Sequence, residues 1–334
     1  KLVSMTDNEL ILDEKIPDSL VSTVSSIAAR PVSADFSIFV EELKSRFGSS
    51  LDAILLYGSC LRTQEIGDGV VDFYVVVDDY SNAYQEHYLC YFNEWLPPNV
   101  FYLEVSAQER VLRSKYAVIS MAEFEKGNQY WFHSYLWARF AQPVRLLYAR
   151  DEVLRQRIYN SLAHAVVAFL TPAIKALGSC VVTAEEIWVK GLMFTYAAEL
   201  RPERETRARQ LAEINLDDYK YLTDHALPEL AGILKKLPQE NQIQGEYYYQ
   251  CLADEFERKK SLRCWWLRRW QGRILSVLRL VKATFTFRDC IDYAAWKIER
   301  HTGVSIEITP RLRRHPVLFG CKVFWRLFRR GVLR

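Results

Sequence analysis

The sequence has no CxxC pair, no ladder of the kind that binds zinc, and no uncharged apolar run of 18 residues. Its seven cysteines are scattered along the chain, a pattern typical of reduced thiols in a cytosolic type of compartment rather than of a disulfide framework. The low counts of 13 Gly and 11 Pro exclude a collagen-like or linker-dominated chain. We therefore expect neither a signal peptide nor a membrane-spanning helix.

What is present is the composition of a folded globular protein, because 50% of the residues are hydrophobic and 25% are charged. At 334 residues the chain has room for about two domains of ordinary size. Changes of pattern divide it into a first domain at 1–150, a helical domain at 151–257 and a basic C-terminal region at 258–334.

Charge is distributed unevenly along the chain, although the net charge is only +3. Residues 258–334 contain 20 Lys and Arg against four Asp and Glu, a net charge of +16. Residues 1–257 contain 24 Lys and Arg against 37 Asp and Glu, a net charge of −13. A basic end of this kind is suited to an anionic surface, either a nucleic acid or an anionic lipid membrane.

Hydrophobic periodicity predicts an α+β fold, in which a mixed sheet with flanking helices is followed by a mostly helical domain and a basic amphipathic C-terminal segment. A helix is expected at Asp35–Phe47 and is ended by Gly48. Residues 120–235 are expected to be helical, with prolines as breaks between helices. The expected strands are Ala53–Tyr57, Val70–Val77 and Val100–Val105, and the expected basic helices are Leu262–Ala283 and Val317–Leu333.

The densest chemistry follows the first expected strand, where Tyr57 is followed by Gly58 and Ser59. Glycine allows a phosphate to approach the backbone, and a following helix N-terminus favours negative charge. Thirteen residues after Ser59, Asp72 lies near the start of the next strand, within reach of a metal bound to such phosphates. This order of strand, Gly-Ser and strand aspartate resembles the nucleotidyltransferase superfamily of DNA polymerase β type.

The superfamily usually has a second carboxylate two residues after the first, but this chain has Tyr74 there. Asp78 has the right parity, yet six residues of strand place it about 20 Å from Asp72. We therefore expect Glu104, on a neighbouring strand, to be the second metal ligand. Such oxygen ligands suit Mg²⁺ bound to a triphosphate, with Mn²⁺ as an alternative.

A narrower resemblance covers about residues 50–210, where a series of motifs follows the order of the mitochondrial-type phosphatidate cytidylyltransferases. The chain resembles this translocator assembly and maintenance family of CDP-diacylglycerol synthases, in which a single strand aspartate is the rule. It departs from the family at Cys60, Ala117, Ala198 and Glu199. The matching motifs are Tyr57-Gly58-Ser59 with Gln64, Asp72 to Asp79, His87-Tyr88, Lys115 to Ser120, Trp137 to Val144, and Thr195 to Arg201.

The resemblance implies that CTP and phosphatidic acid react to give CDP-diacylglycerol and pyrophosphate. It implies Asp72 and Glu104 as metal ligands, and Lys115 and Arg139 as cationic clamps, one for CTP and one for the lipid phosphate. Glu199 and Arg201 have a supporting role, and His87 is expected to pack or cap a helix. The residues expected to bind the nucleotide are Tyr57, Gly58, Ser59, Gln64 and Arg201.

The basic C-terminal region fits the same reading, because basic helices with aromatic faces lie in the interface of an anionic bilayer. We expect Val317–Leu333 to dock on such a membrane, with the protein peripheral to the cytoplasmic face of a bacterial inner membrane or to the matrix side of the mitochondrial one. No nucleic-acid partner is expected on this hypothesis, and a homo-oligomer is left open. Two alternatives remain: a nucleotidyltransferase acting on RNA or another polar acceptor, and a catalytically inactive scaffold.

Overall fold

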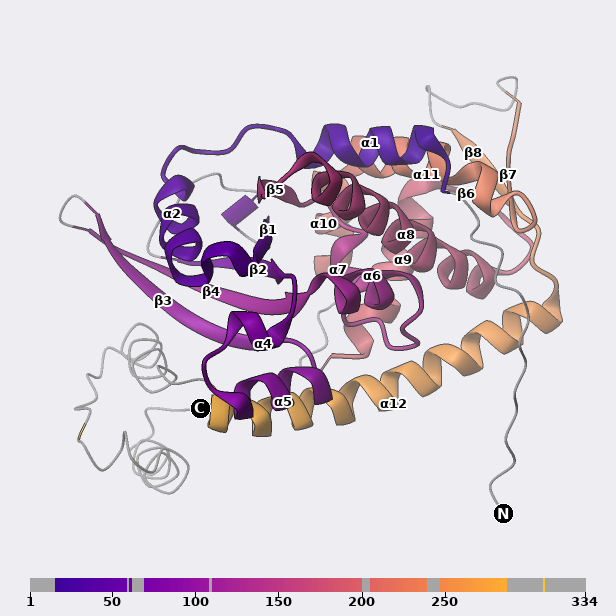
Figure 1. Ribbon diagram of the computed structural model, residues 1–334. Helices are drawn as coiled ribbons and strands as arrows, with labels where there is room; N and C mark the ends of the chain where they lie inside the picture. The colour runs from indigo at the N-terminus through magenta and orange to yellow at the C-terminus, as the bar shows by residue number, and fades with distance from the viewer. Residues whose placement is uncertain are drawn as a thin grey trace, which may run out of the picture.

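The computed structural model describes residues 16–58, 60–61, 69–107, 110–199, 205–238, 247–286 and residue 309. Its centre is a five-stranded sheet in the order β3-β4-β2-β1-β5 (Figure 1). Strands β2 and β4 are parallel, and the other neighbouring pairs are antiparallel. The α+β class with a mixed sheet is therefore confirmed. The strands are β1 at Leu51–Tyr57, β2 at Val70–Val77, β3 at Asn99–Ala107, β4 at Arg110–Ser120 and β5 at Arg145–Ala149.

Alternate residues of the sheet point into two separate cores, as the period of two in a strand requires. Phe73 and Val75 of β2 belong to the core beneath α2 (Phe36–Phe47). Tyr74 and Val76 belong to a larger core shared with the helical part of the chain. Residue 72 has the parity of Tyr74, so the Asp72 side chain points toward the helical side of the sheet.

Helices cover the second face of the sheet and extend beyond it (Figure 1). A small antiparallel sheet in the order β6-β8-β7 lies among them, with strands at Val181–Thr183, Tyr248–Cys251 and Leu234–Lys236. The larger core joins sheet residues to residues of these helices, and the division of the chain at residue 150 stays a prediction. Besides α2, the helices are α1 at Asp18–Ala28, α4 at Tyr80–Ala83, α5 at His87–Trp95, α6 at Met121–Gln129, α7 at Trp137–Phe140, α8 at Glu152–Leu177, α9 at Ala184–Ala197, α10 at Glu205–Ile214, α11 at Leu216–Leu230 and α12 at Glu255–Thr286.

The expectation that residues 120–235 are helical is wrong at β5, which pairs with β1 at the edge of the main sheet. Five residues between two helices are too few to show a strand period. The prolines are also misjudged as breaks at two positions, because Pro172 lies inside α8 and Pro228 inside α11. An internal proline costs roughly 3 kcal/mol, and packing of the apolar faces of these helices offsets that cost.

Helix α8 is long and apolar enough to cross a membrane by length and composition alone. In the structure, however, it is the central helix of the larger core, with Ile158, Leu162, Phe169 and Leu170 fully or almost fully buried. Its apolar residues are therefore accounted for by packing within the protein.

Helix α12 is longer than the expected Leu262–Ala283 helix and extends it at both ends. It runs along one side of the molecule, from the small sheet to α5 (Figure 1). The Lys282 side chain holds its end in place by donating hydrogen bonds to the carbonyl oxygens of Leu96 and Pro98, the latter at 2.8 Å. The inner side of α12 is therefore held against the segment between α5 and β3.

Candidate active site

One cavity, with a volume of about 410 Å³, lies between the end of the main sheet and the helices α7, α9 and α12. Its volume lies within the range of small-molecule sites. Four residues singled out from the sequence line it together. They are Tyr57, Gly58, Asp72 and Arg139.

Gly58 and Asp72 meet because the register of β1 and β2 pairs Tyr57 with Asp72. Gly58 has φ of +88°, a region that favours glycine. A Cβ atom on Gly58 would lie 3.0 Å from the Asp72 Oδ2 atom, so a larger residue there would push the carboxylate aside by a few tenths of an ångström. Gly58 and Asp72 thus lie side by side, as their order in the sequence predicts.

Burial and nearby positive charge have opposite effects on the pKa of the Asp72 carboxyl. Burial raises its pKa above the ordinary value, while the charges of Lys115 and Arg139 lower it. Lys115 is on β4, directly opposite Asp72 in the β2–β4 register. Lys115 was predicted to be a clamp, but no sequence pattern showed that its segment is a strand parallel to β2. The parallel pairing of β2 with β4 therefore places the Lys115 side chain beside the Asp72 carboxylate.

Arg139 belongs to the short helix α7 and lies in the cavity wall among aromatic rings. Its guanidinium carbon is 4.6 Å from the centre of the Tyr135 ring and 5.3 Å from that of Tyr57. Its Nη1 group donates hydrogen bonds to the Tyr74 hydroxyl at 2.9 Å and to the Tyr135 carbonyl at 3.3 Å. Tyr74, two residues after Asp72 on β2, thus orients Arg139 in the cavity wall.

Three further cavity residues were not found from the sequence. Arg279 reaches in from α12, with its guanidinium carbon 3.7 Å from the centre of the Tyr135 ring. Burial raises the pKa of Tyr135, but Arg139 and Arg279 outweigh burial and leave it below the ordinary value. Burial and the charge of Arg279 lower the pKa of His133 to about 4, so this imidazole is neutral at pH 7. No local motif marks these residues, because their proximity depends on how α12 packs.

Glu104 does not meet Asp72 in the structure. It pairs with Arg113 across β3 and β4, and accepts hydrogen bonds from the Arg113 Nε at 3.0 Å and the Tyr102 hydroxyl at 2.6 Å. Two strand spacings and two residues of strand separate it from Asp72, a distance of about 12 Å. The expectation that both carboxylates bind one ion is therefore corrected, because Glu104 is too far away and already has a cation.

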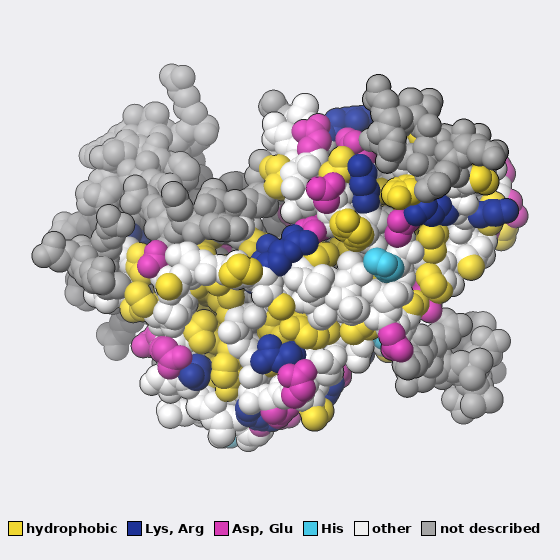
Figure 2. Space-filling view, turned by 90° about the horizontal axis from the view of Figure 1, so that it is seen from above, with side chains coloured by type: hydrophobic (Ala, Val, Ile, Leu, Met, Phe, Trp, Pro, Cys, Tyr) yellow, Lys and Arg dark blue, Asp and Glu magenta, His cyan; other side chains and the backbone are white. Residues whose placement is uncertain are grey.

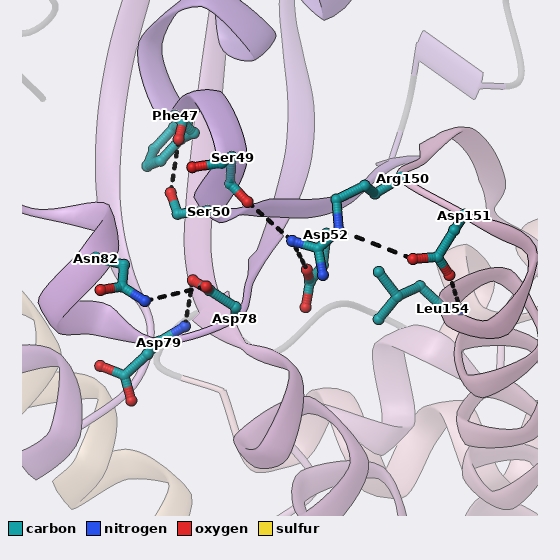
Figure 3. Close-up of polar contacts among 10 residues, drawn as sticks. All are labelled: Phe47, Ser49, Ser50, Asp52, Asp78, Asp79, Asn82, Arg150, Asp151 and Leu154. Carbon is teal, nitrogen blue, oxygen red and sulfur yellow. Dashed lines mark hydrogen bonds and ion pairs between the residues drawn. The ribbon is translucent and has the colours of Figure 1, made fainter.

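The carboxylates at the far end of β2 have a structural use. Asp78 accepts a hydrogen bond from the Asn82 amide at 3.0 Å, and Asp79 caps α4 by accepting from the Ser81 backbone N–H at 2.7 Å. Figure 3 shows Asp78 beside Asn82, with the ion pair between Asp52 and Arg150 nearby. The Val-Asp-Asp part of the resemblance therefore ends a strand and starts a helix, away from the cavity.

Several predicted positions lie outside the described residues. They include Ser59 and Gln64 of the first motif, Arg201, and the expected docking helix Val317–Leu333. Among supporting residues, Glu199 lines the cavity, whereas His87 begins α5. No cluster of three or more His, Cys, Asp or Glu side chains suited to a metal occurs in the described part of the chain.

The outer side of α12 is a second notable surface. Large apolar side chains are exposed along it at intervals of three or four residues: Leu262, Trp266, Trp270, Ile274, Val277, Val281 and Phe285. We call these seven residues the α12 stripe. Between residues 258 and 286 the chain has nine Lys and Arg and no Asp or Glu. On the face seen from above, by contrast, acidic and basic side chains are interspersed (Figure 2).

Comparison with known proteins gives little beyond the fold. No family model matches the sequence, and no curated protein matches it significantly. Among solved structures, a nucleotidyltransferase-like protein from Exiguobacterium sibiricum is similar, with 11% identity, a TM-score of 0.23, and coverage of 66% of this chain and 98% of that one. This level of similarity says nothing of a substrate or partner, and the fold class rests on the observed strand order.

Proposed function

We propose that the cavity is the active site of a nucleotidyltransferase. One observation carries the proposal: Gly58 at the end of β1, Asp72 on β2 and the cationic Arg139 line one end of a single cavity, and a second cation, Lys115, lies opposite Asp72 on β4. Nucleotidyl transfer brings two anions together, so it needs positive charge and positioning more than a strong general base. The site supplies both.

Gly58 is suited to the triphosphate of the nucleotide, because its backbone can approach phosphate oxygens closely. Asp72, beside it, fits a divalent cation, since Mg²⁺ is often bound by one or two carboxylates together with phosphate oxygens and water. Asp72 and Glu199 are the carboxylates of the cavity lining. A bound Mg²⁺ or Mn²⁺ would neutralise phosphate charge.

In the reaction we propose, an oxygen of the acceptor phosphate bonds to the α-phosphorus of the nucleotide. The bond from that phosphorus to the bridging oxygen breaks, and its electron pair leaves with pyrophosphate. A phosphate monoester dianion is already a nucleophile, so no side chain has to remove a proton. Lys115 and Arg139 offset the charge that accumulates as the two anions approach.

For the substrates we propose CTP and phosphatidic acid, and for the location an anionic membrane surface. The motif order described above supports the nucleotide and the lipid, and the α12 stripe with its flanking arginines supports the surface. The alternative acceptor is RNA, since interleaved arginines and aromatic side chains also bind single strands.

The test is transfer from CTP labelled at the α-phosphate to phosphatidic acid in vesicles, with Asp72→Asn as the variant. The amide has the shape of the carboxylate without its charge, so we expect turnover to fall at least a hundredfold, by roughly 3 kcal/mol of transition-state stabilisation. Asp78→Asn is the matched control and should keep activity, because Asp78 lies at the other end of β2. Equal activity of wild type and Asp72→Asn would contradict the proposed site. If RNA is labelled and the lipid is not, then RNA and not phosphatidic acid is the acceptor.

A further inference from the structure

Two partly buried arginines approach the same aromatic ring from different parts of the chain. Arg139 is on α7, Arg279 is on α12, and the guanidinium carbons lie 4.6 Å and 3.7 Å from the centre of the Tyr135 ring. Burial lowers the pKa of Arg279, and the like charge of Arg139 lowers it further. Holding two like charges together costs free energy unless an anion compensates them.

The described residues leave this pair incompletely compensated. The Nη2 group of Arg279 is buried and has no hydrogen-bond partner there, and its Nε donates to the Pro97 carbonyl at 3.3 Å. The charges of Asp72 and Glu199 act on Arg139, whose hydrogen bonds go to a hydroxyl and a carbonyl, so the uncompensated donor of the pair is on Arg279. A buried donor without a partner costs about 1–3 kcal/mol, so a ligand oxygen is the expected partner.

We propose that Arg139 and Arg279 form a subsite for the phosphate monoester group of the acceptor, adjacent to the nucleotide end at Gly58 and Asp72. This inference rests on the proposed nucleotidyl transfer. Arginine suits the group because its planar fork binds two phosphate oxygens at once. Arg279 is thereby assigned a substrate-binding role that no sequence motif marks.

The placement of Arg279 is fixed by packing. A Cβ atom on Gly272 would lie 2.6 Å from the Ala198 carbonyl oxygen, so α12 can approach the end of α9 this closely only with glycine there. Lys282 anchors the next turn at Pro98. Gly272, Leu275, Ser276 and Arg279 line the cavity from the inner side of the helix, opposite the α12 stripe. The stripe and Arg279 therefore lie on opposite sides of one helix, and packing of the inner side fixes where Arg279 enters the cavity.

The experiment measures binding rather than turnover. Calorimetry on the full chain would follow inorganic phosphate and glycerol 3-phosphate, each with and without a non-hydrolysable CTP analogue. In Arg279→Gln we expect phosphate affinity to fall about tenfold or more, and CTP-analogue affinity to stay within about twofold. Arg269→Gln, an exposed site on the same helix, is the control and should change neither. Arg279→Lys keeps the positive charge but lacks the planar guanidinium, so its affinity for phosphate should lie between those of wild type and Arg279→Gln.

The outcomes separate the subsite from the proposed function. Phosphate binding that is lost when the CTP analogue binds, or that is unchanged in Arg279→Gln, overturns the acceptor subsite while leaving nucleotide binding intact. Absence of CTP-analogue binding in wild type refutes the proposed function, and phosphate titration then still reports on the arginine pair. A second arm compares vesicles of phosphatidic acid with vesicles of phosphatidylcholine to distinguish a lipid phosphate from a soluble one; an Arg279 effect confined to the soluble monoester excludes the lipid source.

Discussion

Replacement of Gly58 by alanine should affect stability and activity through two separable causes. The first is backbone strain, because Gly58 has φ of +88° and an L-residue there costs about 1–3 kcal/mol. The second is the contact of the new Cβ with the Asp72 Oδ2 atom at 3.0 Å, which forces the carboxylate to shift by a few tenths of an ångström. A shift of that size beside the reacting phosphates should lower turnover about tenfold to a hundredfold.

Gly48→Ala is the matched control for the first cause. Gly48 also has positive φ, at +54°, but an added Cβ would have nothing within 4 Å. Both variants should therefore lose unfolding free energy of the same order, measured by urea denaturation, while only Gly58→Ala loses transfer activity and CTP affinity. If Gly58→Ala is fully active, or if Gly48→Ala is equally impaired, then the Gly58–Asp72 contact is not part of an active site.

Two further predictions concern the cavity wall and the surface. Folding lowers the pKa of His133 from 6.5 to about 4, so the unfolded chain binds more protons between these pH values. The contribution of His133 to stability is therefore full above about pH 6.5 and decreases as the pH falls toward 4, by up to about 3 kcal/mol. His133→Gln should remove that part of the pH dependence of urea unfolding, and an unchanged pH profile would contradict the prediction. Replacing Trp266 and Trp270 with serine should weaken binding to anionic vesicles at least tenfold in a flotation assay without altering CTP affinity. Tyr221→Ser, a control at an exposed aromatic residue on α11, should leave vesicle binding unchanged. If the double variant binds vesicles as well as wild type does, the α12 stripe is not the membrane contact.

Local patterns were enough to predict three strands of the main sheet, β1, β2 and β3, and the first half of the site, but not β4 or β5. The valine-rich run at Val70–Val77 is a strand with the expected bounds, and the Asp35–Phe47 helix begins one residue later than expected. Gly58 and Asp72 meet because both belong to one antiparallel pair, whose register follows from adjacent strands. Contacts close in sequence were therefore within reach of sequence reasoning.

The remaining features depend on contacts between distant segments. The pairing of β4 with β2 places Lys115 beside Asp72, and no pattern within either strand specifies that partner. Arg279 reaches Tyr135 from a helix more than a hundred residues later in the chain. Glu104 was predicted to be a metal ligand because it lies on a strand expected next to that of Asp72. In the structure β4 lies between those two strands, so Glu104 is too far from Asp72 to bind the same ion.

The absence of a second strand carboxylate has a physical explanation in this structure. Tyr74 occupies that position, and its hydroxyl accepts a hydrogen bond from Arg139. A carboxylate there would pair with Arg139 and neutralise it, so less positive charge would face the cavity. With tyrosine, Arg139 keeps its charge for a ligand, while Asp72 has the charge of Lys115 beside it on β4. Two carboxylates, Asp72 and Glu199, and two arginines, Arg139 and Arg279, line the cavity, and this charge balance is the one that the proposed transfer between two anions would use.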